Sequence, residues 1–171
     1  MGNPETLTPA TPPAESPIPP LESGDHLTRE EFERRYDAMP NLKKAELIEG
    51  VVYLPSPVRW RQHASRHADL IGWLGTYQAG TPGVEVGDNG TVRVDLENEP
   101  QPDAVMIVEP SHGGRVKIST DDYIEGAPEL VAEIAASSAS IDLNTKLRVY
   151  RRNQVREYLV WRVLDGAIDW F

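Results

Sequence analysis

Apolar residues recur along the chain at two spacings, and the change between them separates predicted helices from predicted strands. Between residues 58 and 78 apolar and aromatic positions recur every three to four residues, as on one face of a helix. Residues 141–152 show the same spacing. A shorter helix is predicted over residues 28–38, because Thr28 and Glu31 have the spacing of a capping box. The pattern therefore predicts three helices.

Short β-prone runs lie between and after these helices. They cover residues 45–54, where Gly50 indicates a tight turn or bulge, and then residues 103–108, 130–135, 155–163 and 168–171. Residues 84–86 and 91–96 flank a Gly-Asp-Asn-Gly segment, which predicts a hairpin. Helices and strands in this order predict an α/β or α+β domain with a central mixed sheet.

The first 26 residues have a different composition from the rest. They are rich in Pro, Thr, Ser and Glu, and they contain four acidic residues but no Lys or Arg. Such a segment cannot bury enough apolar surface to order itself. We expect a disordered acidic tail over residues 1–26 and one folded domain over residues 27–171.

Cysteine content and apolar run lengths limit the cellular setting. The chain has no cysteine, which excludes disulfide bonds and thiolate metal sites and fits a reducing compartment. No apolar run approaches the ~20 residues of a membrane-spanning helix, and the N-terminus lacks the pattern of a signal peptide. We expect a cytoplasmic protein that does not enter a membrane.

Two carboxylates stand inside apolar, β-prone runs. Asp103 begins the run DAVMIV, and Glu133 lies near the end of ELVAEI. An ionised carboxylate among apolar neighbours is costly unless a cation lies beside it. Two such groups on neighbouring strands predict a shared metal ion, which is the chemistry of a metal-dependent phosphodiesterase.

The net charge of −10 opposes a nucleic-acid partner, because Lys and Arg supply most of the non-specific affinity for phosphates. Positive charge is nevertheless concentrated in two segments. One contains Arg59 and Arg61, and the other contains Arg151 and Arg152. These segments could form a basic rim that binds nucleic acid, or they could be two solvated helix faces.

Segment order and spacing resemble the Uma-type family of restriction-endonuclease-like proteins, which belongs to the PD-(D/E)XK nuclease superfamily. The resemblance covers residues 27–171 and rests on ELIEG, a helix opened by His63, QPDAVMIV, and APELVAEIAASSASIDLNTKLRVYRRNQVREYLVW. It implies a restriction-endonuclease-like sheet flanked by helices, and an endonuclease that uses Mg²⁺ or Mn²⁺. Asp103 matches the Asp of the PD motif, and Glu133 matches the (D/E); both are the implied metal ligands.

The lysine of the superfamily pattern is missing, because Ala135 stands two residues after Glu133. In the Uma-type relatives the lysine has moved to the following helix, so the resemblance assigns its role to Lys146. If so, its ammonium should lie closer to the Asp103 and Glu133 carboxylates than any other Lys or Arg does. An exposed pair with Asp142, four residues earlier, is the alternative for Lys146. Glu46 matches the first acidic position of the family, with Glu49 as its alternative.

Two histidines precede these residues. His63 matches a recurrent family position, and we expect it to contact phosphate or close the site. His67 follows at HxxxH spacing, which could bind a transition metal, although the glutamate of the zinc-protease motif is missing. We expect His67 to be a packed or half-exposed helix residue.

The residues and the family resemblance together predict a DNA endonuclease, and the resemblance implies that its catalytic residues are Asp103, Glu133, Lys146 and Glu46. One alternative is a catalytically degenerate protein that binds nucleic acid or protein, which the acidic charge and the missing lysine favour. Another is an interaction protein that forms a homodimer through its last strand, because that predicted strand ends at the chain terminus. Fold alone does not decide among these hypotheses.

Overall fold

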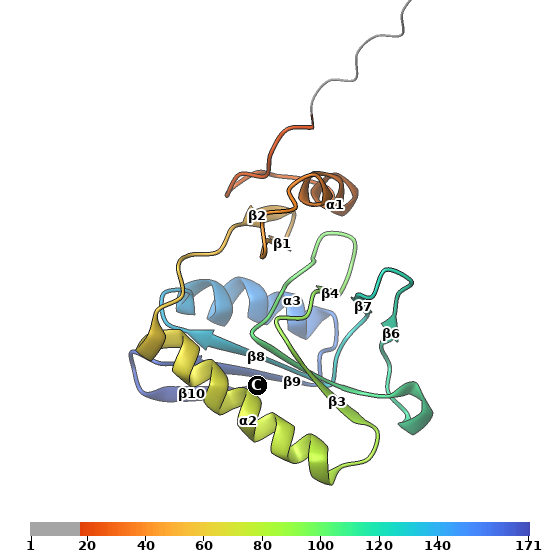
Figure 1. Cartoon of the computed structure of the whole chain (residues 1–171), viewed down its shortest axis with the longest axis vertical. Coiled ribbons are helices and arrows are strands. Elements are labelled where there is room, and N and C mark those ends of the chain that lie inside the picture. The colour runs from red at the N-terminus through yellow and green to blue at the C-terminus, as the bar shows by residue number, and fades with distance from the viewer. Residues whose placement is uncertain (1–17) are drawn as a thin grey trace, which may run out of the picture.

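The structure, a computed structural model, describes residues 18–171. The N-terminal part forms a small unit of α1 (Arg29–Asp37) and a hairpin of β1 (Glu46–Ile48) with β2 (Val51–Tyr53), at the upper end of Figure 1. Positive φ angles at the turn between the two strands confirm the tight turn expected there. The buried side chains of this unit form their own small core, made of Leu21, Phe32, Ala45, Leu47 and Val52.

The Thr28 hydroxyl accepts a hydrogen bond from the Glu31 amide and so caps α1 as predicted. The carboxylate of Glu31 hydrogen-bonds to Arg34 and Arg35. Leu21 is buried and Gly24 donates to the Val52 carbonyl, so residues directly before the expected boundary at residue 27 pack against β2. Residues 1–17 of the predicted acidic tail lie outside the described residues.

The main sheet contains five strands in the order β10-β9-β8-β5-β3. Their bounds are β3 (Val84–Asp88), β5 (Ala104–Val108), β8 (Leu130–Ala135), β9 (Glu157–Arg162) and β10 (Ala167–Trp170). Strands β8 and β9 run parallel, and all other neighbours run antiparallel. This confirms the central mixed sheet with flanking helices that the sequence predicted.

Two helices, α2 (Ser65–Gly80) and α3 (Leu147–Arg152), cover the main sheet, one in front of it and one behind it in Figure 1. In α2, Leu70 and Leu74 pack in a cluster with Ile134 and other even-numbered residues of β8. In α3, Tyr150 packs in a cluster with Val131 of β8. Because successive residues of a strand point to opposite faces, each helix covers one face.

The hairpin predicted around residues 87–90 is wrong. Strand β3 pairs with β5, whereas β4 (Val92–Arg93) leaves the main sheet and pairs with β7 (Ile124–Glu125), which also pairs with β6 (Lys117–Ile118). The chain turns at Asn89 with a positive φ, as expected. The burial of Val92 is consistent with this pairing of β4. Its side chain packs with Val105, Ile107 and Val116 in a cluster that is separate from the one beneath α2.

Both long predicted helices begin with a π-helical turn. These are η1 (Trp60–Ala64), which leads into α2, and η3 (Ile141–Lys146), which leads into α3. A short 3₁₀ turn, η2 (Pro110–His112), lies in the loop after β5. Single π turns are frequent at functional sites, so the segments around these two turns are candidates for such a site. Within residues 18–171 no helix is both long enough and apolar enough to cross a membrane.

Candidate active site

Asp103 directly precedes β5, and Glu133 lies on the adjacent strand β8. Ala104 of β5 pairs with Ala132 of β8, so one further antiparallel step places Asp103 opposite Glu133. Residues directly opposite each other in a sheet share a face. Both side chains are buried, and Asp103 Oδ2 accepts a hydrogen bond of 2.7 Å from the Ile134 amide.

Lys146 extends from η3 into the space between two acidic residues. Its Nζ donates hydrogen bonds of 2.8 Å to Glu133 Oε1 on β8 and to Glu46 Oε1 on β1. Asp142 Oδ1 on the same turn lies 3.7 Å away. Because both Asp142 and Lys146 are buried, they are not the exposed helix pair considered as an alternative. Glu49, the other candidate acid, instead pairs with Arg148 and Arg152.

The acidic residues outnumber the ammonium group that they surround. Burial alone would lower the pKa of Lys146, but the charges of Glu133, Glu46 and Asp142 raise it well above its ordinary value. Burial raises the pKa of Glu133, and the nearby carboxylates add to this effect against the opposing charge of Lys146. The pKa of Asp142 is also raised, mainly by burial. Lys146 is therefore charged within a cluster that has an excess of acidic groups.

Asp103 has a different environment. Burial would raise its pKa, but the contact with His63, the charge of Lys44 and the Ile134 amide together lower it to about 2. His63 Nε2 lies 3.2 Å from Asp103 Oδ1, and Lys44 Nζ lies 3.7 Å from the same oxygen. Asp103 is thus an ionised carboxylate at neutral pH.

Sequence reasoning missed Lys44. The signal that could have found it is its position two residues before Glu46, because alternate residues of an extended segment lie on the same side. It also expected Lys146 to be the cation nearest to both Asp103 and Glu133. In the structure Lys146 contacts Glu133, whereas Lys44 approaches Asp103.

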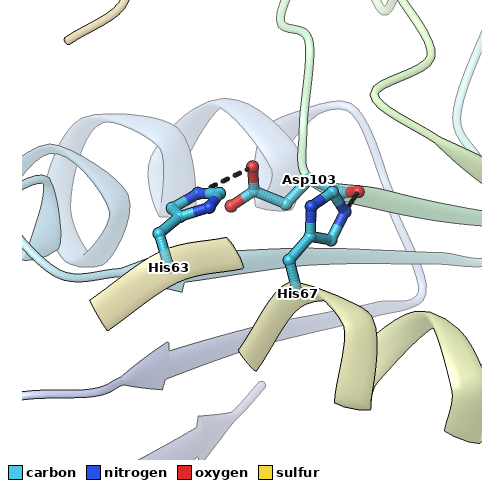
Figure 2. A group of neighbouring side chains, drawn as sticks. All are labelled: His63, His67 and Asp103. Carbon is cyan, nitrogen blue, oxygen red and sulfur yellow. Dashed lines mark hydrogen bonds and ion pairs between the residues drawn. The ribbon is translucent and has the colours of Figure 1, made fainter. Parts of the chain in front are cut away.

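Two histidines approach Asp103 from the η1–α2 helix, as Figure 2 shows. His67 Nε2 lies 2.6 Å from the Asp103 carbonyl oxygen and 2.9 Å from Asp88 Oδ1. Among the described residues, His63, His67 and Asp103 form a group whose ligand atoms all lie within 4.8 Å of one another. His67, expected to be an ordinary helix residue, therefore lies at the site.

The two arginine pairs differ in their surroundings. Arg59 and Arg61 are exposed where the chain enters η1, a few residues before His63. Arg151 and Arg152 are exposed at the far end of α3, and Arg152 forms ion pairs of 3.1 Å with Glu49 and 3.5 Å with Asp95. The first pair is thus adjacent to a site residue in sequence, whereas part of the second pair is neutralised by acidic neighbours.

Comparison with known proteins shows which family and which solved structure this chain resembles. The model of the Uma2 family, described as putative restriction endonuclease, matches residues 29–171. A search of curated proteins finds no match. Among solved structures, a putative nuclease of the DUF820 family from Anabaena variabilis ATCC 29413 resembles the chain with a TM-score of 0.60 and 13% identity, over 85% of this chain and 84% of that one.

At this identity the structural likeness concerns the fold alone, and it supports a nuclease-like architecture. The family match covers much more than a single motif. It extends from the first residue of α1 to the last residue of the chain, and so includes the strands and turns that carry Asp103, Glu133 and Lys146. The chain therefore belongs to the Uma2 family of restriction-endonuclease-like proteins.

Proposed function

We propose that the protein is a metal-dependent endonuclease that hydrolyses phosphodiester bonds in DNA. The observation that carries this proposal is the pair of facing carboxylates, Asp103 and Glu133, with Lys146 hydrogen-bonded to Glu133 and to Glu46. The family and the fold support a nuclease. The metal, the DNA substrate and the roles of the residues are our proposals.

The side-chain types suit Mg²⁺ or Mn²⁺, while among the described residues the one set of three donor residues with ligand atoms within 4.8 Å of one another is His63, His67 and Asp103. Carboxylate oxygens are the ligands these ions prefer, and here they come from Asp103, Glu133, Asp142 and Glu46. Two ammonium groups, Lys44 and Lys146, lie against them, which leaves an excess of two negative charges when all six groups are ionised. Asp142 Oδ1 is also buried without a hydrogen-bond partner. A divalent cation would balance this charge.

In this proposal Asp103 and Glu133 hold the ion, and Glu46 contributes through water. A bound Mg²⁺ supplies Lewis-acid polarisation of the phosphoryl group and activation of a water molecule. The Ile134 amide and Lys44 fix the orientation of Asp103. Lys146 fixes Glu133 and Glu46, and its positive charge stabilises the charge that develops on the phosphoryl oxygens.

The proposed nucleic-acid contacts are made by basic residues near the two helices. His63 and the exposed Arg59 and Arg61 would bind phosphates beside the cleaved bond, and Arg151 and Arg152 would bind the backbone further away. These local charges would have to act against the acidic total of the chain.

Cleavage of plasmid DNA in Mg²⁺ or Mn²⁺ tests the proposal. Asp103→Asn keeps the shape of the side chain but removes the charge, and we expect it to reduce cleavage by at least about a hundredfold. Asp69→Asn is the matched control, because Asp69 is exposed and pairs only locally with Arg66. Absence of cleavage by the wild type, or equal cleavage by Asp103→Asn, would contradict the nuclease proposal.

A second candidate function is binding of DNA or protein without cleavage. The observation that favours it is Lys146, whose ammonium group already donates to two carboxylates, while Ala135 occupies the usual lysine position. Metal-dependent DNA binding without cleavage by the wild type would support this function.

A homodimer through β10 is also proposed. This strand lies at one edge of the main sheet, and Ile168, Trp170 and Phe171 are each about half exposed. Sedimentation of the wild type and Ile168→Asp would test it, because a new charge on this strand should lower the fraction of dimer. An all-monomer wild type would contradict it.

A further inference from the structure

His63 and His67 form one side of a cluster that the proposed nuclease mechanism does not fully use. His63 lies on the π turn η1, and His67 follows four residues later in α2, so the two rings lie on neighbouring turns with centroids 5.7 Å apart. Figure 2 shows both rings approaching Asp103 at the start of β5. Three chain segments therefore bring two imidazoles and a carboxylate together.

Two oxygen atoms lie close to His67 Nε2. It lies 2.6 Å from the Asp103 carbonyl oxygen and 2.9 Å from Asp88 Oδ1. An imidazole nitrogen carries at most one proton, so it can donate fully to only one of these two oxygens. A cation bound at this point would interact favourably with the nitrogen and with the oxygens together.

From this geometry we propose that His63, His67 and Asp103 form a second divalent-metal site, which selects first-row transition ions over Mg²⁺. Donor spacing supports the assignment. The 3.2 Å between His63 Nε2 and Asp103 Oδ1 is close to the ligand separation of about 3.4 Å in a tetrahedral site with bonds of about 2.1 Å. All three ligand atoms lie within 4.8 Å of one another.

Selectivity follows from the two nitrogen donors. Imidazole suits Zn²⁺, Co²⁺, Ni²⁺ and Fe²⁺, whereas Mg²⁺ prefers oxygen ligands in a near-octahedral arrangement. Two histidines and one carboxylate leave open coordination positions, as in metal sites that bind water or substrate. A phosphate oxygen or a water molecule could occupy them.

This inference goes beyond the proposed nuclease function and does not require it. The two proposed sites share Asp103, but the second site takes no ligand from Glu133, Lys146 or Glu46. Binding at the second site can therefore be measured without DNA and without any cleavage assay.

Co²⁺ is the probe for this site, because its visible d–d absorption becomes stronger when it moves from water into a protein site of low coordination number, whereas Mg²⁺ has no d electrons and does not absorb there. Titration of the full chain, followed by absorption and calorimetry, should show one site for Co²⁺ that a large excess of Mg²⁺ does not displace. His63→Gln and His67→Gln should each weaken Co²⁺ binding by at least about tenfold. His112→Gln is the control, because His112 is exposed on η2 and contacts Ser111 and Glu109.

Two further measurements keep the proposals separate. Glu133→Gln should retain the Co²⁺ spectrum while it loses Mg²⁺-dependent cleavage. A wild type that binds Co²⁺ but does not cleave DNA would contradict the nuclease proposal and leave the second site intact. Unchanged Co²⁺ binding in both histidine variants, or ready displacement by Mg²⁺, would show that the histidines are only hydrogen-bonded side chains.

Glutamine at position 67 keeps a hydrogen-bond donor for the Asp103 carbonyl, so the fold should survive. If a variant does not fold, NMR of the wild type tests the same proposed metal site. Addition of Co²⁺ should shift and broaden the imidazole signals of His63 and His67 first and leave those of His112 sharp. Equal effects on all three histidines would overturn the proposal.

Discussion

Within residues 18–171 two positively charged side chains, Lys146 and Arg93, are each surrounded by acidic groups, and only the first group has the composition that we propose for an active site. The first surrounds Lys146, as described above. The second surrounds Arg93, whose Nε lies 2.9 Å from Glu33 Oε1 and 3.6 Å from Glu99 Oε2. Tyr123 covers the guanidinium, with its ring centroid 4.2 Å from Arg93 Cζ.

Each cluster contains a buried glutamate whose pKa is raised by burial, Glu133 beside Lys146 and Glu99 beside Arg93, but the clusters differ in their connections. Arg93 also pairs with Asp121, so this planar group links α1, β4 and the loop before β7. Lys146 instead lies between carboxylates on β1 and β8, and one of these, Glu133, faces the aspartate that two histidines approach. Buried acidity alone therefore does not distinguish the two clusters, and the proposed site rests instead on the several metal-ligand types that converge near Asp103.

Removal of Lys146 should have the largest effect on stability. Lys146→Met leaves Glu133, Glu46 and Asp142 buried without their counter-charge, which we expect to cost about 3–5 kcal/mol of unfolding free energy. Urea unfolding at neutral pH measures the loss. Lys43→Met is the control, because Lys43 is exposed and donates only to the Pro40 carbonyl. A loss below about 1 kcal/mol would mean that the cluster is not held by this ammonium.

Substitution of Glu99 should have the second largest effect on stability, and the size of this effect should depend on pH. Burial and the nearby Glu33 raise the pKa of Glu99 to about 8, against the charge of Arg93. The folded state therefore keeps a proton that the unfolded state releases above its ordinary pKa of 4.5. The contribution of this group to stability is present below that value and is lost as pH rises to about 8.

Glu99→Gln should remove this pH dependence. The variant should gain stability relative to the wild type across that window, by an amount on the order of a few kcal/mol at its upper end. Urea unfolding of both proteins at several pH values measures the difference. A stability difference between the two proteins that stays constant with pH would contradict the raised pKa of Glu99. The group around Arg93 would then lack the raised carboxyl pKa found in the group around Lys146.

The arginine pairs should give the smallest effect, on DNA binding rather than on stability. In Ca²⁺, Arg59→Ala/Arg61→Ala should reduce the slope of log affinity against log salt by about 0.9 per lost phosphate contact. Arg151→Ala/Arg152→Ala should reduce it less, because Arg152 already pairs with Glu49 and Asp95. Equal slopes in the wild type and both double variants would show that neither arginine pair contacts the DNA.

The sequence predicted the main strands and the two central acids for a physical reason. A carboxylate within an apolar run is unusual, so Asp103 and Glu133 can be recognised without a structure. The register that places Asp103 opposite Glu133 cannot be recognised in this way, because it depends on pairing between strands that lie more than twenty residues apart in the sequence. The position of Lys146 came from the family resemblance, since a lysine at helical spacing looks like any solvated residue.

Other features left weaker signals. His67 fits an ordinary helical face, and although its HxxxH spacing from His63 is a local signal, nothing local indicates that both rings approach Asp103. The turn residues around Asn89 favour a hairpin, but the burial of Val92, which the local sequence does not reveal, accompanies the pairing of β4 with β7 instead. A π turn is also too short to change the periodicity of a helix, so neither η1 nor η3 could be predicted from apolar spacing.

The two π turns make the site sensitive to the number of residues as well as to their identity. Deletion of Ala64 would bring His63 one residue closer to His67 and rotate the two side chains relative to each other by about 100°. Deletion of Thr145 would do the same to Asp142 and Lys146. Either change keeps every proposed ligand and most of the buried core, yet it would separate the side chains that converge there. In this fold, insertions and deletions at two turns can therefore switch the site on or off without any substitution of a site residue.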